Sequence, residues 1–261
     1  MVKCYDMAKN RGFNLYLLIF QLVVLLAIVR FSFLFGAYVS SIHGNGTIYD
    51  VSWPNCSAAT LNLSNFGIVG VNGGVEFSSN PCLQSETTWF NSYAVYLNTS
   101  YPGGWYSNQF NGSPNVCSLS DSTCLSYDYG YNSAQASIKY ADLQNVHAKL
   151  WLLDVETANS WSNNTMVNRA NLMGMMAAIK KYDPFSTVGF YSTYYQYNLI
   201  VGDWQNGDPG WLGTGLQSAD EAADYCSTVS FTGGPVIMTQ YTLKLDQDYV
   251  CSGQSNNLFT D

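Results

Sequence analysis

Residues 149–156 read KLWLLDVE, residues 165–182 read TMVNRANLMGMMAAIKKY, and residues 186–192 read STVGFYS. The first and third stretches are short and have apolar centres, as strands buried on both faces do. The middle stretch carries apolar residues at helical spacing and is followed by Asp183-Pro184, which stops a helix. A strand, an amphipathic helix and a second strand in this order predict a parallel sheet covered by helices.

The same alternation extends outward in both directions. Strands are predicted at 47–52, 66–72, 92–98, 149–156, 186–192, 235–241 and 244–250, and helices at 133–147, 165–182 and about 218–225. Seven or eight strands in roughly 220 residues fit a small α/β barrel of the TIM type. The last two strands are too close for a helix between them, so the barrel is expected to be irregular there.

The N-terminal segment predicts a membrane anchor. Residues 12–29 carry no charge, and the apolar character resumes after Arg30 up to about Val39. This length exceeds a signal-peptide core and approaches the roughly 20 residues that cross a bilayer as a helix. Basic residues are more frequent before the span than after it, which places the N-terminus in the cytoplasm and the C-terminal domain outside. A cleaved signal, and hence a secreted protein, stays an alternative because Val39-Ser40-Ser41 offers small residues to a signal peptidase.

Composition limits the partners. Charged residues make up 11% of the chain, and the formal net charge is −8. Residues 1–41 hold four basic residues and one acidic residue, so the exported part is strongly acidic. Such a surface repels phosphate backbones and argues against nucleic acid as a partner. The expected organisation is a cytoplasmic tail (1–11), a transmembrane anchor or signal segment (12–39), a linker (40–46) and one barrel domain (47–261).

Cysteine and histidine usage bears on metal and nucleophile chemistry. Six cysteines lie in the exported part, an even number as a disulfide framework requires: Cys56, Cys82, Cys117, Cys124, Cys226 and Cys251. The chain has only His43 and His147 and no CxxC pattern, so no structural zinc site is expected. A Ser-His-Asp triad is rejected too, because His147 is expected late on a helix with no suitable partner.

The strongest chemical feature is the pair of carboxylates in Asp154-Val155-Glu156. Residues at i and i+2 of a strand face the same side, and these two stand at the strand's carboxyl end, where barrel enzymes hold their catalytic groups. Two close acids repel, which raises one pKa and suits a general acid. The alternative interpretation is that the pair binds a cation or caps the next helix.

Three further acids extend this pattern. Asp50 ends the first strand, and Asp246 and Asp248 form a second i, i+2 pair on the last strand. The first and last strands of a closed barrel are neighbours, so these acids are expected to converge with Asp154 and Glu156. Taken alone, each of these acids is more often a surface or capping residue than a catalytic one.

Aromatic residues near the acidic strand ends suggest a stacking surface for sugar rings. The candidates for substrate binding are Trp53, Tyr191, Trp211 and Tyr241, together with Asp248. The plainer interpretation is that many aromatic residues belong to the core. Trp151 is assigned to the core, because its side chain faces away from Asp154 and Glu156.

Several segments, taken in order, resemble one family. The stretches YDVS (49–52), DVE (154–156), GFYS (189–192), QY (240–241) and DQD (246–248) resemble the core motifs of glycoside hydrolase family 25, the N-acetylmuramidase lysozymes. Longer stretches resemble an actinobacterial-type, secreted subgroup of that superfamily. The similarity covers about residues 47–251.

The resemblance implies a barrel with eight strands and fewer than eight helices, which cleaves peptidoglycan glycan strands without metal or cofactor. It implies Glu156 as general acid and Asp154 as the group that orients the substrate acetamido group or a water. Asp50 and Asp246 would be the outer acids of the site. Acetamido assistance and direct water attack both remain open.

Two function hypotheses follow from the sequence. The first is an extracytoplasmic glycosidase that acts on peptidoglycan or another cell-surface polysaccharide. The second is a non-catalytic glycan-binding or surface-contact protein on the same barrel, because a fold does not guarantee turnover. The cysteines are expected to pair as nearest neighbours, 56 with 82, 117 with 124 and 226 with 251, since each pair brackets a loop at the strand ends; the resemblance points the same way.

Overall fold

The computed structural model describes residues 48–57, 64–103, 113–242 and 246–251. The chain divides into two compact units, residues 1–45 and 46–261. The predicted anchor at 12–39 lies outside the described residues. Among the helices that are described, none is both long and apolar enough to cross a membrane.

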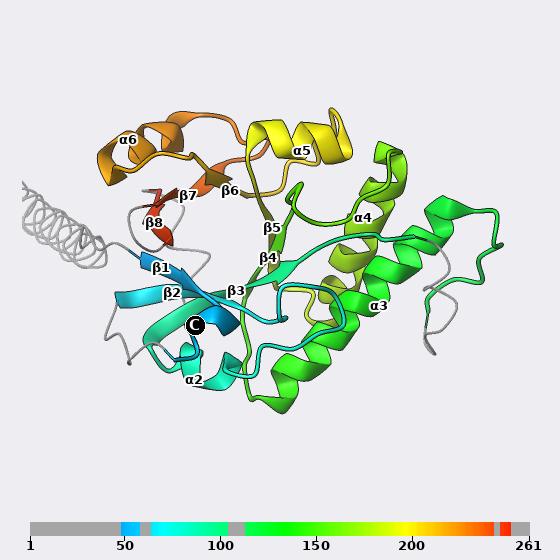
Figure 1. The fold of residues 1–261 in the computed structure, drawn as a ribbon, viewed down its shortest axis with the longest axis horizontal. Coiled ribbons are helices and arrows are strands. Elements are labelled where there is room, and N and C mark those ends of the chain that lie inside the picture. Colours follow the sequence, from blue (N-terminus) through cyan, green and yellow to red (C-terminus); the bar gives the residue numbers. More distant parts are fainter. Residues whose placement is uncertain (1–47, 58–63, 104–112, 243–245, 252–261) are drawn as a thin grey trace, which may run out of the picture. The chain divides into compact units, whose positions relative to one another are not determined.

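Eight strands close into a barrel in which neighbours along the chain are neighbours in space (Figure 1). They are β1 (Ile48–Val51), β2 (Ser64–Gly70), β3 (Phe90–Asn98), β4 (Leu150–Asp154), β5 (Thr187–Ser192), β6 (Gly210–Gly213), β7 (Val236–Thr242) and β8 (Asp246–Val250). The first seven strands run parallel, whereas β8 is antiparallel to both β7 and β1. This confirms the predicted α/β barrel and its irregular closure.

The helices are fewer than the strands in the described part of the chain. They are α2 (Leu83–Thr87), α3 (Ser122–Leu143), α4 (Thr165–Tyr182), α5 (Tyr194–Val201) and α6 (Ala219–Asp224), with short 3-10 turns η1 (Trp53–Asn55) and η3 (Tyr225–Ser227). The helix predicted at 165–182 is confirmed to the residue. The helix predicted at 133–147 begins earlier, because Asp121 caps it by accepting from Cys124 N, and it ends before His147.

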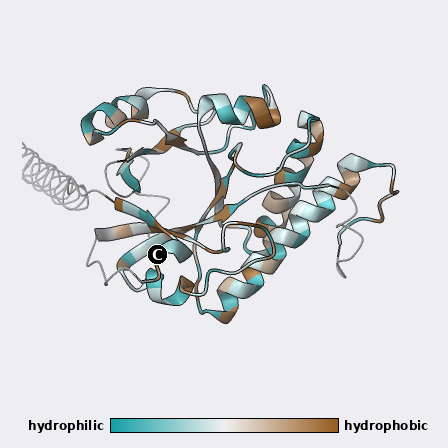
Figure 2. Cartoon of the chain, viewed as in Figure 1, coloured by the Kyte–Doolittle hydropathy of each residue, from teal (hydrophilic) through white to brown (hydrophobic). Residues whose placement is uncertain are grey.

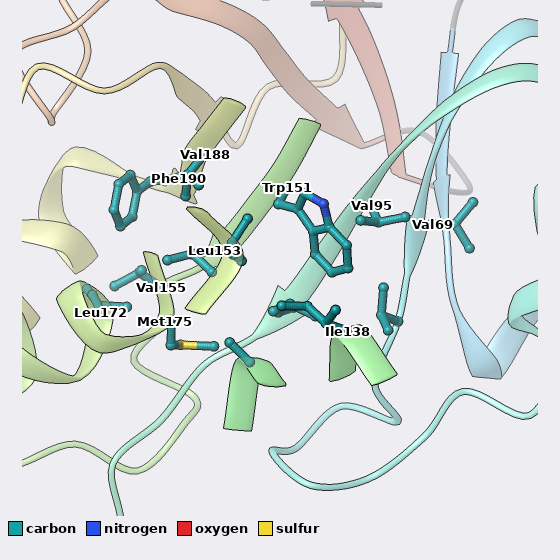
Figure 3. Packing of buried hydrophobic residues seen from close by; sticks show 14 of the residues in the cluster. Val69, Val95, Ile138, Trp151, Leu153, Val155, Leu172, Met175, Val188 and Phe190 are labelled. Atoms are coloured by element: carbon teal, nitrogen blue, oxygen red, sulfur yellow. The ribbon is translucent and has the colours of Figure 1, made fainter. Parts of the chain in front are cut away.

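The core has two parts that lie on opposite faces of the barrel strands. Alternate residues such as Ile48, Ile68, Leu152 and Trp211 cluster inside the barrel. The residues between them point outward to the helices. Figure 3 shows members of this second set, Val69, Val95, Trp151, Leu153, Val188 and Phe190 of the strands and Val155 just after β4, which form one cluster with Ile138 of α3 and with Leu172 and Met175 of α4. Trp151 is 1% exposed, which confirms its assignment to the core.

Helices α3 and α4 approach closely because two glycines face each other's backbone. A Cβ at Gly130 would lie 2.0 Å from Asn171 O, and a Cβ at Gly174 would lie 2.0 Å from Tyr127 O. No side chain fits these positions. Figure 2 shows that both helices carry apolar and polar residues along their length, as expected of helices with one buried face.

Three disulfides join the cysteines as nearest neighbours, as predicted. Cys56 pairs with Cys82, Cys117 with Cys124, and Cys226 with Cys251. The first ties the segment after β1 to the start of α2, and the third ties η3 to the end of β8. Both therefore anchor loops next to the barrel strands.

Candidate active site

The predicted acids come together at the carboxyl end of the parallel strands. Asp50 stands near the end of β1, Asp154 ends β4, and Glu156 follows two residues later. Because β8 is antiparallel, its first residue, Asp246, reaches the same end. The charges of Asp246 and Glu156 act on their neighbours: Asp246 raises the pKa of both Asp50 and Glu156, and Glu156 raises that of Asp154.

Asp154 is held between two neighbouring strands. It lies opposite Asn98 of β3 and Tyr191 of β5, and Asn98 Nδ2 donates to its Oδ2. The side chain is 4% exposed, and Oδ1 is buried with no hydrogen-bond partner in the described residues. Burial, followed by repulsion from Glu156, raises the pKa of Asp154 well above its ordinary value. Asp154 therefore holds its proton strongly, and its Oδ1 has no hydrogen-bond partner among the described residues.

Glu156 is half-buried and is positioned through its backbone. Its carbonyl accepts from Trp161 Nε1 at 2.8 Å and from Asn159 N at 3.2 Å. Burial raises the pKa of Glu156, a hydrogen bond from Gln196 of α5 opposes that rise, and the charge of Asp246 adds to it.

Asp50 and Asp248 form a second pair of acids inside the barrel. They lie on the neighbouring strands β1 and β8, and no described residue donates to Asp248 Oδ2. Burial and the charge of Asp246 raise the pKa of Asp50 to about 7. Asp248 is fully buried, and Trp211 Nε1 donates to its Oδ1 at 2.7 Å. Burial and the charge of Asp50 raise the pKa of Asp248 well above its ordinary value.

Gln240 links this pair to Tyr191. Its Nε2 donates to Asp50 Oδ2 at 3.1 Å, and its Oε1 accepts from the Tyr191 hydroxyl at 2.6 Å. Burial and the surrounding acids, Glu156 and Asp154 first among them, raise the pKa of Tyr191. Tyr191 is therefore a neutral hydrogen-bonding phenol in the middle of the acids.

Asp246 and Asp248, the second predicted pair of acids, lie at different depths. Asp246 is exposed at the start of β8, where Thr242 Oγ1 donates to it at 2.9 Å, whereas Asp248 is buried. The hairpin register, which pairs Asp248 with Gln240, sets this depth.

The four aromatic residues predicted to contact a sugar differ in their exposure to solvent. Trp53 is 48% exposed at the turn after β1, and Tyr191 lies among the acids. Trp211 is 2% exposed inside the barrel, with its ring 4.5 Å from that of Tyr191, so it supports the site from below. Tyr241 is 3% exposed, and strand alternation sets it on the face opposite Gln240. Trp211 and Tyr241 are therefore not available to stack on a sugar.

Sequence reasoning missed several groups at this end of the barrel. Asn98 was inside a predicted strand, and Gln240 was inside a recognised motif, yet neither was given a role. Glu76 lies in the loop after β2, where Ser100 Oγ donates to its Oε2 at 2.5 Å. Its charge raises the pKa of Asp154, so it belongs to the same group of acids. Nothing in the local pattern around Glu76 marks it, since the position depends on how the loop folds.

His147 lies beyond the end of α3 and contacts Asp142 at 3.5 Å, away from the acids. In the described part of the chain, no three His, Cys, Asp or Glu side chains are grouped so as to hold a metal ion.

Comparisons with known proteins bear on the fold. A family model described as Lysozyme-like protein 1 matches residues 120–221, which run from the start of α3 into α6 and include Asp154, Glu156 and Tyr191. A glycosyl hydrolase 25 of Streptococcus pneumoniae, described as a virulence factor that participates in host cell invasion, is similar with a TM-score of 0.55 at 15% identity. The match covers 85% of this chain and 98% of that one.

A muramidase from Trichobolus zukalii is similar with a TM-score of 0.50 at 12% identity, over 81% of this chain and 98% of that one. A search of curated proteins finds no match to the chain. At these identities the solved structures establish a shared fold. The family model matches residues 120–221, which is less than half of the chain, so the comparisons show similarity to a lysozyme-like family over that segment and a fold shared with these glycosyl hydrolases.

Proposed function

We propose that the chain is a glycoside hydrolase that cleaves the glycan strands of cell-wall peptidoglycan. The observation that carries the proposal is the grouping of Asp50, Asp154, Glu156 and Asp246 at the carboxyl end of one barrel, with raised pKa values for the first three. Glycosidases need one carboxyl group that keeps its proton near neutral pH and negative charge beside the sugar ring. The similar muramidase and glycosyl hydrolase 25 support peptidoglycan as the substrate.

Glu156 is the proton donor in this proposal. It is less buried than Asp154, so it can reach a leaving oxygen, and its raised pKa favours the protonated form. As the bond between the anomeric carbon and the leaving oxygen breaks, the Glu156 proton passes to that oxygen. Positive charge then develops on the sugar ring and is stabilised by ionised carboxylates of the site.

Asp154 and Asp50 act on the other side of the bond. The unpartnered Oδ1 of Asp154 accepts a hydrogen bond from the substrate acetamido group or from the attacking water. A water molecule then adds to the anomeric carbon and gives one proton to the Glu156 carboxylate, which restores the starting state of the site. Asp50 and Asp246 supply negative charge, and Trp53 offers an exposed ring for stacking on a sugar.

The location outside the membrane is part of the same proposal. The three disulfides suit an oxidising compartment, and the uncharged residues 12–29 suit an anchor with the N-terminus in the cytoplasm. Mass spectrometry of the protein from its host tests the anchor. We expect peptides from the first residues to be retained, and a mature N-terminus near Ile42 would show a cleaved signal instead.

Release of soluble fragments from dye-labelled peptidoglycan tests the activity. We expect release by the full chain and products with new reducing ends. Binding of the glycan without release would favour the non-catalytic glycan-binding alternative.

A further inference from the structure

The backbone ladder between β2 and β3 stops next to the candidate active site. Val71 N donates to Tyr96 O at 3.0 Å, which continues the parallel pairing just beyond the end of β2. In a parallel ladder the next hydrogen bond would run from Asn98 N to Val71 O. That carbonyl accepts from Asn80 N at 3.0 Å instead, because the loop after β2 folds back onto the strand end. The end of β3 therefore lacks its regular backbone partner.

The side chain of Asn72 supplies the two hydrogen bonds that the backbone does not. Its Oδ1 accepts from Asn98 N at 3.1 Å, and its Nδ2 donates to Asn98 O at 2.9 Å. In a regular ladder Asn98 O would accept from Gly73 N, which donates to Ser78 Oγ at 2.9 Å instead. A side-chain amide carries the same donor and acceptor as a peptide group. Asn72, which is 2% exposed, thus extends the ladder after the backbone has left it.

The residue that Asn72 holds contacts an acid of the site. Asn98 lies opposite Asp154 in the pairing of β3 with β4, and its Nδ2 donates to Asp154 Oδ2 at 2.5 Å. The next residue, Thr99, donates to the Asp154 carbonyl through its backbone N at 3.2 Å and its hydroxyl at 2.5 Å. The end of β3 therefore fixes both the backbone of Asp154 and the rotation of its carboxyl group, with Oδ2 facing β3.

Loss of the Asn72 amide would act on this arrangement from a distance. Within the described part of the chain, the hydrogen bonds of Asn72 go to the backbone of Asn98 and to no acid. Without them, the N–H and C=O of Asn98 lose their partners, and the strand end is free to shift. A small shift is enough to matter, because catalytic groups act only when they are closely aligned.

We propose that Asn72 is a positioning residue of the candidate active site, which holds Asn98 where its amide orients the Asp154 carboxyl group. The inference rests on the proposed glycosidase function, in which Asp154 meets the substrate acetamido group or a water. Asn72 touches neither and acts through Asn98. A carboxyl group that is turned away from its productive orientation stabilises the transition state less, so turnover falls more than substrate binding does.

Titration of the Asp154 carboxyl group tests this role without a substrate. NMR of the full chain in an uncharged detergent follows the labelled carboxyl carbons of aspartate, and Asp154→Asn identifies the signal. Burial and the charge of Glu156 raise the pKa of Asp154, whereas the hydrogen bond from Asn98 lowers it. The charges of Asp50 and Glu76 raise it further. Loss of the aligned donor should therefore raise this pKa while the other acids stay in place.

The variants Asn72→Ala and Asn98→Ala are compared singly and together. We expect each single variant to raise the pKa of Asp154 by about 1, as the loss of a hydrogen bond to a charged group would. The double variant should show the shift of Asn98→Ala and no more, because Asn72 reaches Asp154 through Asn98. Asn171→Ala is the matched control and should leave this pKa unchanged. Asn171 is also a buried amide, but it donates to Ser126 O at 3.4 Å between α3 and α4.

Release of dye from labelled peptidoglycan gives the second readout. Asn72→Ala should lower kcat about tenfold and change KM less, with a pH–activity profile shifted in the same direction as that of Asn98→Ala. Loss of folded protein alone would lower the rate without moving the profile, and circular dichroism measures that loss. If Asn72→Ala does not fold, Asn72→Ser, which keeps a hydroxyl at this position, should give a smaller shift in the same direction.

An unchanged titration of Asp154 in the folded Asn72 variant overturns the inference. A further rise of the pKa when Asn72→Ala is added to Asn98→Ala also overturns it, because Asn72 would then act by another route. If the titration shifts appear but wild type cleaves no glycan, the role of Asn72 stands and the proposed glycosidase function fails. If wild type cleaves glycan and the Asn72 variant keeps its titration and pH profile, the function stands and the inference fails.

Discussion

Gln240 donates to Asp50 and accepts from Tyr191, with the two hydrogen bonds at 3.1 Å and 2.6 Å. This amide couples β7 to β1 on one side and to β5 on the other, across the inside of the barrel. The hydrogen bond from Gln240 lowers the pKa of Asp50 and so opposes the effects of burial and of Asp246.

Replacing Gln240 by Met should therefore raise the pKa of Asp50 further. In the pH–activity profile, the apparent pKa that reports Asp50 should move to a higher pH. This shift is expected whether or not the maximal rate also falls. Gln247→Met is the matched control, because residue 247 is next to Asp248 but on the other face of β8. Equal pH profiles for wild type and Gln240→Met would show that this hydrogen bond does not tune Asp50.

Trp211 should stabilise the fold through its hydrogen bond to Asp248. Trp211→Phe keeps an aromatic ring inside the barrel but leaves Asp248 Oδ1 without its donor, which costs about 1–3 kcal/mol. Thermal unfolding should show a drop in Tm of roughly 2–4 °C per kcal/mol for a domain of this size.

The matched control is Trp204→Phe. Trp204 stacks on Tyr197 with ring centroids 6.5 Å apart, and its indole donates to no described residue. The expected loss of stability is smaller for this variant. If Trp204→Phe were the more destabilising of the two, the hydrogen bond to Asp248 would not be the important term.

Asp50 makes stability depend on pH in a defined direction. Its pKa is 3.8 when exposed and about 7 in the folded protein, so the folded state binds the proton more tightly. The stability that this proton contributes is fully present below pH 3.8 and is lost as the pH rises toward about 7. Asp50→Asn removes the titration and should flatten this fall.

Denaturant unfolding of both proteins between pH 4 and pH 8 measures the effect. We expect Asp50→Asn to be the more stable protein at about pH 8, where wild type buries a charge. The reverse order at that pH would mean that Asp50 is not desolvated as the structure indicates.

The disulfides should differ in their contributions. Cys226 and Cys251 are 25 residues apart, whereas Cys117 and Cys124 are 7 apart. In the chain-entropy account the longer loop stabilises by about 1 kcal/mol more. Paired Cys→Ser variants of each bridge, compared by denaturant unfolding, test this order. Equal losses would point to native-state effects that loop length does not describe.

The sequence predicted most of the barrel because its central strands and α4 have clear periodicity. It missed β6, whose four residues, Gly210–Gly213, are too few to show a strand pattern. It missed α5 because the run Tyr194-Tyr195-Gln196-Tyr197 has modest helix propensity, although Thr193 caps it by accepting from Gln196 N. Local signals fail where tertiary packing decides the structure.

The same limit applies to the site. The four acids were identified because each stands at a strand end, which is a local property. The depth of Asp248 relative to Asp246 depends on the β7–β8 register, and the position of Glu76 depends on a loop held by Phe77 against Tyr129. Neither relationship is contained in the spacing of residues along the chain.

The central claim is that Glu156 donates the proton that breaks a glycosidic bond. Gln at this position keeps the shape of the side chain but cannot cycle a proton, so turnover should fall by roughly 10²–10⁴-fold. Glu221→Gln is the control for the loss of one charge, and circular dichroism checks that the fold is retained. The most direct measurement is the release of reducing ends from purified peptidoglycan by wild type, Glu156→Gln and Glu221→Gln side by side. The account predicts release by wild type and Glu221→Gln and almost none by Glu156→Gln, and equal release by all three would contradict it.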